Sequence, residues 1–253
     1  MPVLKAFINE LFSGQIWKFV IDEKAGLLFA EIRNADNKEV SFASINLNTG
    51  KLNFKDLQLP EKWLTGLGGS VNGVLFLHGY QSAQSPTHKG ITAIDGISGV
   101  ELWSNYTYAI SKLIINGLVA YNTQVQPPIF YLLDTQSGAT LRPYNASIDT
   151  ETVQDILLPD ILNSIPSEFN IFFDGETMGN FHYLEHNEFR IVSLHTSKNG
   201  LLHQTLLITK NGELVYRDIL NDNIQKLQPE AFIVYQNLLI YIKNTRELKI
   251  LNL

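Results

Sequence analysis

Apolar residues in this chain gather in short runs, and a tight turn opens each run. Runs of four to eight apolar residues bounded by Asn, Asp and Gly are typical of β-strands that pair in hairpins. The turn-and-run signal recurs along the whole chain, and a fixed recurrence of this kind predicts a repeat architecture of β-sheets. Its copies, in chain order, are Ala25-Gly26-Leu27-Leu28-Phe29, Asn72-Gly73-Val74-Leu75-Phe76, Asn116-Gly117-Leu118-Val119-Ala120, Asn187-Glu188-Phe189-Arg190-Ile191 and Gln236-Asn237-Leu238-Leu239-Ile240.

A second turn, which ends in glycine, follows the first four runs at Gly50, Gly99, Gly138 and Gly212. No such turn follows the fifth run, so we expect its counterpart at Ser13–Trp17, reached by joining the two ends of the chain. The sequence therefore predicts a single all-β domain over residues 1–253, a five-bladed β-propeller in which the N- and C-terminal strands share one blade. Closure of this kind removes exposed sheet edges. A sixth, degenerate blade within residues 169–184 stays open as an alternative.

The best-preserved unit, ITAIDGISGVELW (Ile91 to Trp103), resembles the repeat of quinoprotein-type β-propellers, in which an Ala-x-Asp-x-x-Thr-Gly-x-x-x-Trp strand–turn–strand closes each blade. FASINLNTGKLNF (Phe42 to Phe54) and FYLLDTQSGATLR (Phe130 to Arg142) are weaker copies. The resemblance implies a propeller fold, also of the WD40-like kind, but no chemistry. The quinone cofactor is not expected, because enzymes of that type are larger, exported and often have a vicinal cysteine pair. The size and weak repeats also resemble uncharacterised bacterial propeller families.

One step between repeats is longer than the others and marks an insertion at about 144–180. Apolar residues recur there at helical spacing, Asp149 and Thr150 are suitable caps, and Pro159 and Pro166 would kink and end a helix. The sequence therefore predicts a mostly helical insertion. It either covers a face or an edge of the propeller, or acts as a lid or docking helix. The first residues, Val3 to Phe12, fit either a strand or a short helix.

Composition narrows the range of partners. The formal net charge of −6 argues against nucleic acid and anionic membranes, whose binding depends on clustered Lys and Arg. The absence of cysteine excludes disulfides, thiolate metal sites and a thiol nucleophile. We find no secretory signal at the N-terminus and no run of 18 apolar residues, so the expected location is the cytoplasm.

The richest candidate site is the polar stretch that follows the second apolar run. His78, Tyr80, His88 and Lys89 place two imidazoles, a phenol and an ammonium within 12 residues, a set suited to an anionic or carbonyl-bearing ligand. Long connections of a propeller emerge on one face, where a rigid scaffold positions binding residues. Arg33 and His195 stand at two other such connections and complete the predicted ligand-binding set. The alternative for these residues is a solvated loop with a histidine bonded to backbone.

Other motifs do not support a reaction. His182-Tyr183-Leu184-Glu185-His186 matches the H-x-x-E-H zinc motif, but that chemistry needs a helix and the surroundings predict a strand. We find no phosphate-binding loop, no dinucleotide fingerprint and no nucleophile elbow, and we expect no metal, cofactor or catalytic residue. The leading hypothesis is a non-enzymatic module that binds an unknown protein or small molecule. The alternatives are a sugar hydrolase or transferase with carboxylates at the channel mouth, and a purely structural subunit.

Overall fold

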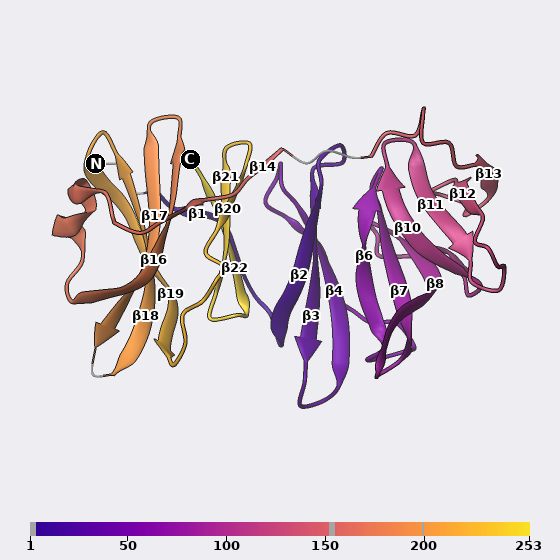
Figure 1. Ribbon diagram of the computed structural model, residues 1–253, viewed down its shortest axis with the longest axis horizontal. Helices are drawn as coiled ribbons and strands as arrows, with labels where there is room; N and C mark the ends of the chain where they lie inside the picture. The colour runs from indigo at the N-terminus through magenta and orange to yellow at the C-terminus, as the bar shows by residue number, and fades with distance from the viewer. Residues whose placement is uncertain (1–3, 152–154, 199) are drawn as a thin grey trace. The chain divides into compact units, whose positions relative to one another are not determined.

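The computed structural model describes residues 4–151, 155–198 and 200–253, and nearly all of its regular structure is β-strand (Figure 1). The all-β prediction is therefore confirmed. Contacts divide the chain into two compact units. We call Ser13–Gln154 the central unit, and Met1–Phe12 with Asp155–Leu253 the terminal unit.

The central unit contains three antiparallel sheets of four strands, and in each sheet the strands pair in chain order. The first sheet is β2 (Gln15–Asp22), β3 (Leu27–Asn34), β4 (Glu39–Asn46) and β5 (Leu52–Leu57). The second is β6 (Thr65–Val71), β7 (Val74–Ser82), β8 (Ser85–Asp95) and β9 (Glu101–Asn105). The third is β10 (Tyr108–Ile114), β11 (Gly117–Asn122), β12 (Phe130–Leu133) and β13 (Thr140–Pro143).

The terminal unit contains a fourth and a fifth sheet, each of five strands among the described residues. The fourth is β15 (Asp160–Leu162), β16 (Glu176–His186), β17 (Phe189–Lys198), β18 (Leu201–Lys210) and β19 (Glu213–Ile224). The fifth runs in the order β1 (Ala6–Leu11), β22 (Glu247–Asn252), β21 (Leu238–Lys243), β20 (Ile233–Tyr235) and β14 (Ile156–Leu157).

The two ends of the chain share this fifth sheet, as the repeat spacing predicts. β1 pairs antiparallel with β22, and Ile8 lies opposite Ile250. The strand prediction for the N-terminus is thereby confirmed over Ala6–Leu11, while residues 1–3 lie outside the described part of the chain. The prediction that Ser13–Trp17 completes the shared sheet is wrong, because Gln15 already begins β2 of the next sheet. The joining strand lies upstream of Gly14 and carries no turn signal of its own.

The predicted turn chemistry is present. Asn72 and Gly73, which join β6 to β7, have φ angles of 55° and 78° and form the left-handed pair that a tight hairpin requires. After β8, Asp95 Oδ1 accepts hydrogen bonds from the backbone N–H groups of Ile97 (3.2 Å) and Ser98 (2.7 Å). These bonds, with that from the Ser98 hydroxyl, lower the pKa of Asp95. The sequence-level repeat is thus a repeat of hairpins and Asx-turns.

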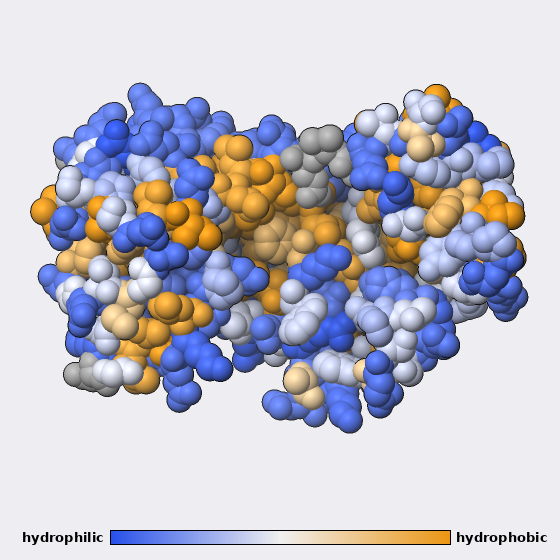
Figure 2. Space-filling model, viewed as in Figure 1, coloured by the Kyte–Doolittle hydropathy of each residue, from blue (hydrophilic) through white to orange (hydrophobic). Residues whose placement is uncertain are grey.

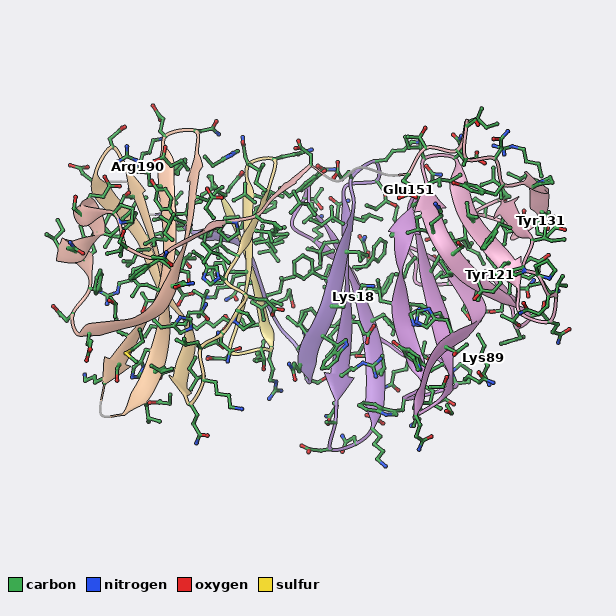
Figure 3. The ribbon with its side chains drawn as sticks, viewed as in Figure 1. Lys18, Lys89, Tyr121, Tyr131, Glu151 and Arg190 are labelled. Carbon is green, nitrogen blue, oxygen red and sulfur yellow. The ribbon has the colours of Figure 1, made fainter. Side chains whose placement is uncertain are left out.

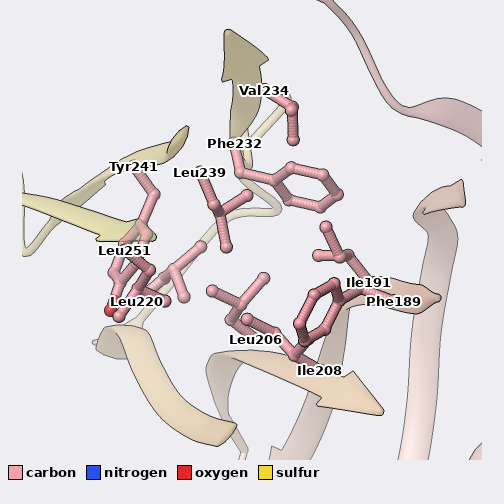
Figure 4. Close-up of a cluster of buried hydrophobic side chains, with 10 residues drawn as sticks. All are labelled: Phe189, Ile191, Leu206, Ile208, Leu220, Phe232, Val234, Leu239, Tyr241 and Leu251. Carbon is pink, nitrogen blue, oxygen red and sulfur yellow. The ribbon is translucent and has the colours of Figure 1, made fainter. Parts of the chain in front are cut away.

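Within each unit the sheets pack face to face and bury apolar side chains between them. Leu75 and Leu77 of β7 pack against Phe29 and Phe42 of the first sheet, whereas Phe76 packs toward the third sheet. Successive side chains of β7 point to opposite faces of its sheet, so this one strand contributes to two hydrophobic cores. The fourth and fifth sheets enclose a similar cluster, which Figure 4 shows: Phe189, Ile191, Leu206, Ile208, Leu220, Phe232, Val234, Leu239, Tyr241 and Leu251.

The prediction of a mostly helical insertion at 144–180 is wrong for the described residues. They form two short edge strands, β14 and β15, and one 3-10 helix, η1 (Ser167–Phe172). Pro159 separates β14 from β15, and Pro166 directly precedes η1. Because proline breaks the interior of a helix, a long helix cannot run through either position. β14 pairs with β20 and β15 with β16, so sheet edges satisfy their backbone groups instead. Val153, part of the predicted helix, lies outside the described residues.

The insertion covers one face of two different sheets. On the third sheet, residues 144–151 fold back over β10, where Ile114 bridges to Glu151 and Tyr144 packs on the cluster around Ile114. The Arg142 guanidinium donates two hydrogen bonds to Asp149 and holds this segment in place. On the fourth sheet, fully buried Phe169 of η1 packs against Val192 and Leu194. Orange surface over β11–β13 on the right of Figure 2 shows that some apolar side chains of the third sheet stay exposed.

The described residues therefore form five separate open sheets, and the predicted closed five-bladed ring is not formed. Within its own unit, the third sheet carries Tyr144 on the cluster around Ile114, and the fourth sheet carries Phe169 on Val192 and Leu194. In the part of the chain that the structure describes, no helix is long and apolar enough to cross a membrane.

Candidate functional site

The site is built from the polar ends of two otherwise buried strands of the central unit. β3 begins with apolar residues and ends with Glu31 and Arg33, and β7 ends in the same way with His78 and Tyr80. Glu31 and His78 are buried, with exposed fractions of 2% and 5%. Buried polar groups need hydrogen-bond partners, so the contacts of Glu31 and His78 indicate the role of each residue.

Glu31 and Arg33 form a clamp between the first and second sheets. The Arg33 Nε–H donates to Glu31 at 2.6 Å, and the second Glu31 oxygen accepts the backbone N–H of Leu67 on β6 at 2.7 Å. The Arg33 guanidinium also donates to the carbonyls of Thr65 (2.8 Å) and Trp63 (3.4 Å). Charged side chains thus satisfy the free edge of β6, where a bare edge strand would invite pairing with another chain.

Two indoles flank the guanidinium of Arg33. Its Cζ atom lies 5.1 Å from the ring centre of Trp63 and 5.9 Å from that of Trp17. Such cation–π contacts hold the planar group in one orientation. Three of the five N–H donors of Arg33 bond to described residues, which leaves two donors without a partner in that part of the chain.

An aromatic cluster lies beside Gly66 of β6. The rings of His78 and His88 stack with centres 3.6 Å apart, and Tyr80 meets both rings edge-on at 4.9 and 5.3 Å. Gly66 of β6 leaves the room for this cluster, because a Cβ there would lie 2.8 Å from His78 Nε2 and 3.1 Å from the Tyr80 hydroxyl. Among the residues that the structure describes, neither ring nitrogen of His78 has a hydrogen-bond partner.

The surroundings of the cluster lower the pKa of both imidazoles. Burial, the neighbouring His88 and the cations Lys18 and Arg33 together lower the pKa of His78 to about 3. Partial burial, and then Lys18, lower the pKa of His88. The polar stretch that the sequence predicts to be a loop is in fact an extension of the β7–β8 hairpin, and this pairing places His88 directly opposite Tyr80.

A pocket of about 370 Å³ opens where Arg33 and Tyr80 meet the tip of that hairpin. The pocket is lined by Arg33, Trp63, Leu64 and Tyr80, and by Ser82 to Pro86 of the hairpin tip. Two residues of the predicted set therefore share a pocket. Lys89, on β8, is exposed and lies near Glu61, whose pKa it helps to lower after the backbone N–H groups of Leu64 and Trp63.

His195 is the predicted site residue that does not belong to this group. It lies on β17 in the terminal unit, 2% exposed, and its Nε2 accepts the backbone N–H of Gln228 at 3.1 Å. Burial lowers its pKa and holds the ring in the neutral form that this bond requires. His195 is thus a histidine bonded to backbone inside its own unit.

Three residues that contribute to the site were absent from the predicted set: Lys18, Glu31 and Trp63. Glu31 could have been noticed, because a carboxylate inside the apolar run Leu27–Ile32 needs a buried partner. Lys18 and Trp63 carry no comparable signal, since one is a lone cation in a strand and the other stands in a connection.

The arrangement favours binding over acid–base catalysis. Both oxygens of Glu31 are engaged, and Glu61 accepts the N–H groups of Trp63 and Leu64. A general acid or base needs a carboxyl group with access to the substrate. Glu31 is buried with both oxygens engaged, whereas Glu61 is exposed and accepts both N–H groups at Oε1. Among the described residues, no group of three or more His, Cys, Asp or Glu is placed to hold a metal ion.

Acidification from about pH 7.5 to about pH 5 is expected to destabilise the central unit through His78. An unfolded histidine takes up a proton near pH 6.5, whereas folded His78 stays neutral down to about pH 3. The unfolded state therefore binds more protons than the folded state in this window. The free energy of unfolding decreases as the pH is lowered, by at most about 1.4 kcal/mol per pH unit.

Urea unfolding followed by tryptophan fluorescence measures this effect, because Trp17, Trp63 and Trp103 all lie in the central unit. His78→Leu removes the titrating group and should flatten the pH dependence. Equal slopes in the wild type and the variant would contradict the assignment.

The comparisons with known proteins give a local family match and weak structural likenesses. A family model described as a domain of unknown function (DUF4905) matches residues 21–103, about a third of the chain, which include Arg33, Trp63, Tyr80 and His88. No curated protein matches the sequence.

Several solved structures align over most of the chain. The β-propeller domain of the Trilobed protease from Pyrococcus furiosus is 8% identical, with a TM-score of 0.35, over 94% of this chain and 65% of that one. Kuenenia stuttgartiensis hydrazine synthase is 14% identical, with a TM-score of 0.30, over 88% of this chain and 60% of that one. Pyrococcus horikoshii acylaminoacyl peptidase is 10% identical, with a TM-score of 0.31, over 90% of this chain and 35% of that one.

The chain thus spans less than two thirds of the length of each of these proteins. Scores of this size carry no argument about function. The quinoprotein-type resemblance of the repeats stays a prediction, since the one family model that matches describes no function.

Proposed function

We propose that this protein is a non-enzymatic binding module and that its ligand is a small molecule held in the pocket between Arg33, Tyr80 and the β7–β8 hairpin tip. The observation that carries the proposal is the fixed guanidinium of Arg33, which keeps two N–H donors beside the pocket. A donor held in place by Glu31 and two indoles loses little conformational freedom when a ligand binds.

The pocket walls indicate the kind of ligand. Trp63 and Tyr80 contribute aromatic rings to the lining, and Ser82 and Ser85 contribute hydroxyl groups. Polar groups at fixed positions orient the ligand in small-molecule sites. A planar ring that bears a hydrogen-bond acceptor fits these walls.

The predicted alternatives are less well supported. A sugar hydrolase needs two carboxylates beside the substrate, and the described lining residues of this pocket include no Asp or Glu. A purely structural subunit would have no use for a guanidinium with spare donors beside a pocket.

The test introduces a large side chain at the hairpin tip to fill the pocket. Ala83 is exposed and lines the pocket, whereas Gln81 is exposed on the same hairpin outside it. We expect benzoate or benzamide to give saturation-transfer NMR signals with the wild-type protein. Ala83→Trp should remove them because its indole occupies the pocket.

Gln81→Trp is the matched control, since it adds the same side chain to the same hairpin and should leave the signals unchanged. Absence of signals from both probes with the wild-type protein, or equal signals with Ala83→Trp, would refute the pocket as a ligand site.

A further inference from the structure

Lys18 on β2 is an exposed cation (Figure 3). Glu31 lies opposite it on β3, but no ion pair joins Lys18 to a described carboxylate. The one hydrogen bond of Lys18 among the described residues goes from Nζ to the neutral carbonyl of Leu67, at 3.0 Å. An ammonium has three donors, so two remain for a ligand that reaches this sheet edge.

Lys18 and Arg33 hold the same edge of β6. Arg33 bonds the carbonyl of Thr65 and Lys18 bonds that of Leu67, two residues further along. Carbonyls two residues apart on one strand edge are about 7 Å apart, so the two cationic groups lie side by side. Between them, Glu31 occupies the backbone N–H of Leu67.

The local charges do not cancel. Glu31 supplies one negative charge and faces the positive charges of Arg33 and Lys18. Its ion pair with Arg33 (2.6 Å) leaves the charge of Lys18 as a local excess of positive charge. This excess stands out in a chain whose formal net charge is −6.

The histidine stack supports an anion rather than a metal ion. The rings of His78 and His88 are within 19° of parallel, so their nitrogen lone pairs cannot converge on one ion. Lys18 and Arg33 would also repel a metal cation. The nitrogens of His78 are buried, lack protein partners and face the glycines of β6, so His78 serves as the support on which His88 rests.

We propose that the ligand of this pocket carries a carboxylate or phosphate group, and that Arg33 and Lys18 bind this group at the edge of β6 with His88 beside it. The proposal rests on the proposed function, because it specifies the charge of the molecule in the same pocket. Tyr80 and Arg33 connect the pocket to the histidine stack, since both residues line the pocket and both lie near the stacked rings.

Binding of an anion should bring a proton with it. In the free protein, burial and Lys18 lower the pKa of His88. The other groups around the stack are Arg33, Glu31, His78 and the Tyr80 phenol, while β10 contributes apolar Ile110. A bound anion opposes the effect of the cations, so His88 takes up a proton from the buffer and affinity rises as the pH falls, at most about tenfold per pH unit.

The experiment compares benzoate with benzamide, which has the same ring and no charge. Calorimetric titration at pH 6, 7 and 8 in two buffers of different ionisation enthalpy should show tighter binding of benzoate, with proton uptake, and no pH dependence for benzamide. Lys18→Gln keeps a donor for Leu67 and removes the charge, so benzoate should bind roughly tenfold more weakly and benzamide should be unaffected. Lys18→Arg should restore benzoate binding, and His88→Asn should abolish the pH dependence.

The outcomes separate this inference from the proposed function. Equal affinity for benzoate and benzamide, or no effect of Lys18→Gln on benzoate, would overturn the anion site while the pocket remains a binding site. Binding of neither probe to the wild-type protein would overturn both. Lys62→Gln, which removes a cation from an exposed ion pair with Glu39, is the control for a general loss of charge.

Discussion

Glu31→Ala is expected to lower the free energy of unfolding of the central unit by about 3–5 kcal/mol, the range for removing one partner of a buried ion pair. The side chains of Glu31 and Arg33 are 3% and 14% exposed, so solvent replaces little of the lost interaction. The variant leaves the guanidinium without its counter-charge and the Leu67 N–H without its acceptor. Glu31→Gln should cost less, because the amide oxygen can still accept one of these bonds.

Urea unfolding followed by tryptophan fluorescence reports on this unit alone, since every tryptophan of the chain lies in it. The matched control is Glu39→Ala. Glu39 pairs with Lys62 at 3.5 Å on the surface, with side chains 32% and 63% exposed, and such pairs contribute about 0–1 kcal/mol. A loss below 1 kcal/mol for Glu31→Ala would show that the clamp does not hold the first and second sheets together.

Gly66→Ala is expected to cost about 1–3 kcal/mol and to displace the histidine stack, as overpacking of a filled core does. The new methyl group would lie 2.8 Å from His78 Nε2 and 3.1 Å from the Tyr80 hydroxyl. The backbone of Gly66 is not in the left-handed region, so alanine suits its conformation and the cost comes from the contact alone.

A double-mutant cycle isolates that contact. In a His78→Ala background the closer contact is removed and only that with the Tyr80 hydroxyl at 3.1 Å remains, so adding Gly66→Ala should cost less than in the wild type. Chemical shifts of the His88 ring protons should move in the single Gly66→Ala variant. If Gly66→Ala cost the same in both backgrounds, the glycine would be required by the strand itself and not by the imidazole.

The hairpins were predictable because their signals are local. The Asn72-Gly73 turn and the Asp95-to-Gly99 Asx-turn each lie within a few residues, and short side chains decide their backbone conformation. The pairing of β1 with β22 could also be predicted. The last repeat is incomplete at the C-terminus, which indicates that a strand from the N-terminus completes it.

The insertion could not be predicted in this way. The apolar spacing of Ile156, Leu157, Ile161 and Leu162 fits a helix as well as two strands, and periodicity alone does not separate the two over short runs. The edges of β20 and β16 decided the outcome, because they offer backbone partners to residues on either side of Pro159.

The candidate site was predicted in part for the same reason. His78, Tyr80 and His88 come from neighbouring strands of one hairpin, so their proximity follows from local pairing. Arg33 joins Tyr80 only because the first sheet packs against the second. His195 carries the same kind of side chain, but it lies in another unit and bonds to its own backbone.

The amino-acid sequence by itself determined the β-strands, their hairpin turns and the sharing of one sheet by the two ends of the chain, because short-range steric and hydrogen-bonding preferences select these features. Only the tertiary structure decided that Glu31 and Arg33 bind the edge of β6, that Lys18 bonds the carbonyl of Leu67 on the same edge, and that the insertion covers two sheet faces. These features depend on which sheet packs against which, and contacts between residues 30 to 50 positions apart leave no mark on the local pattern of the sequence.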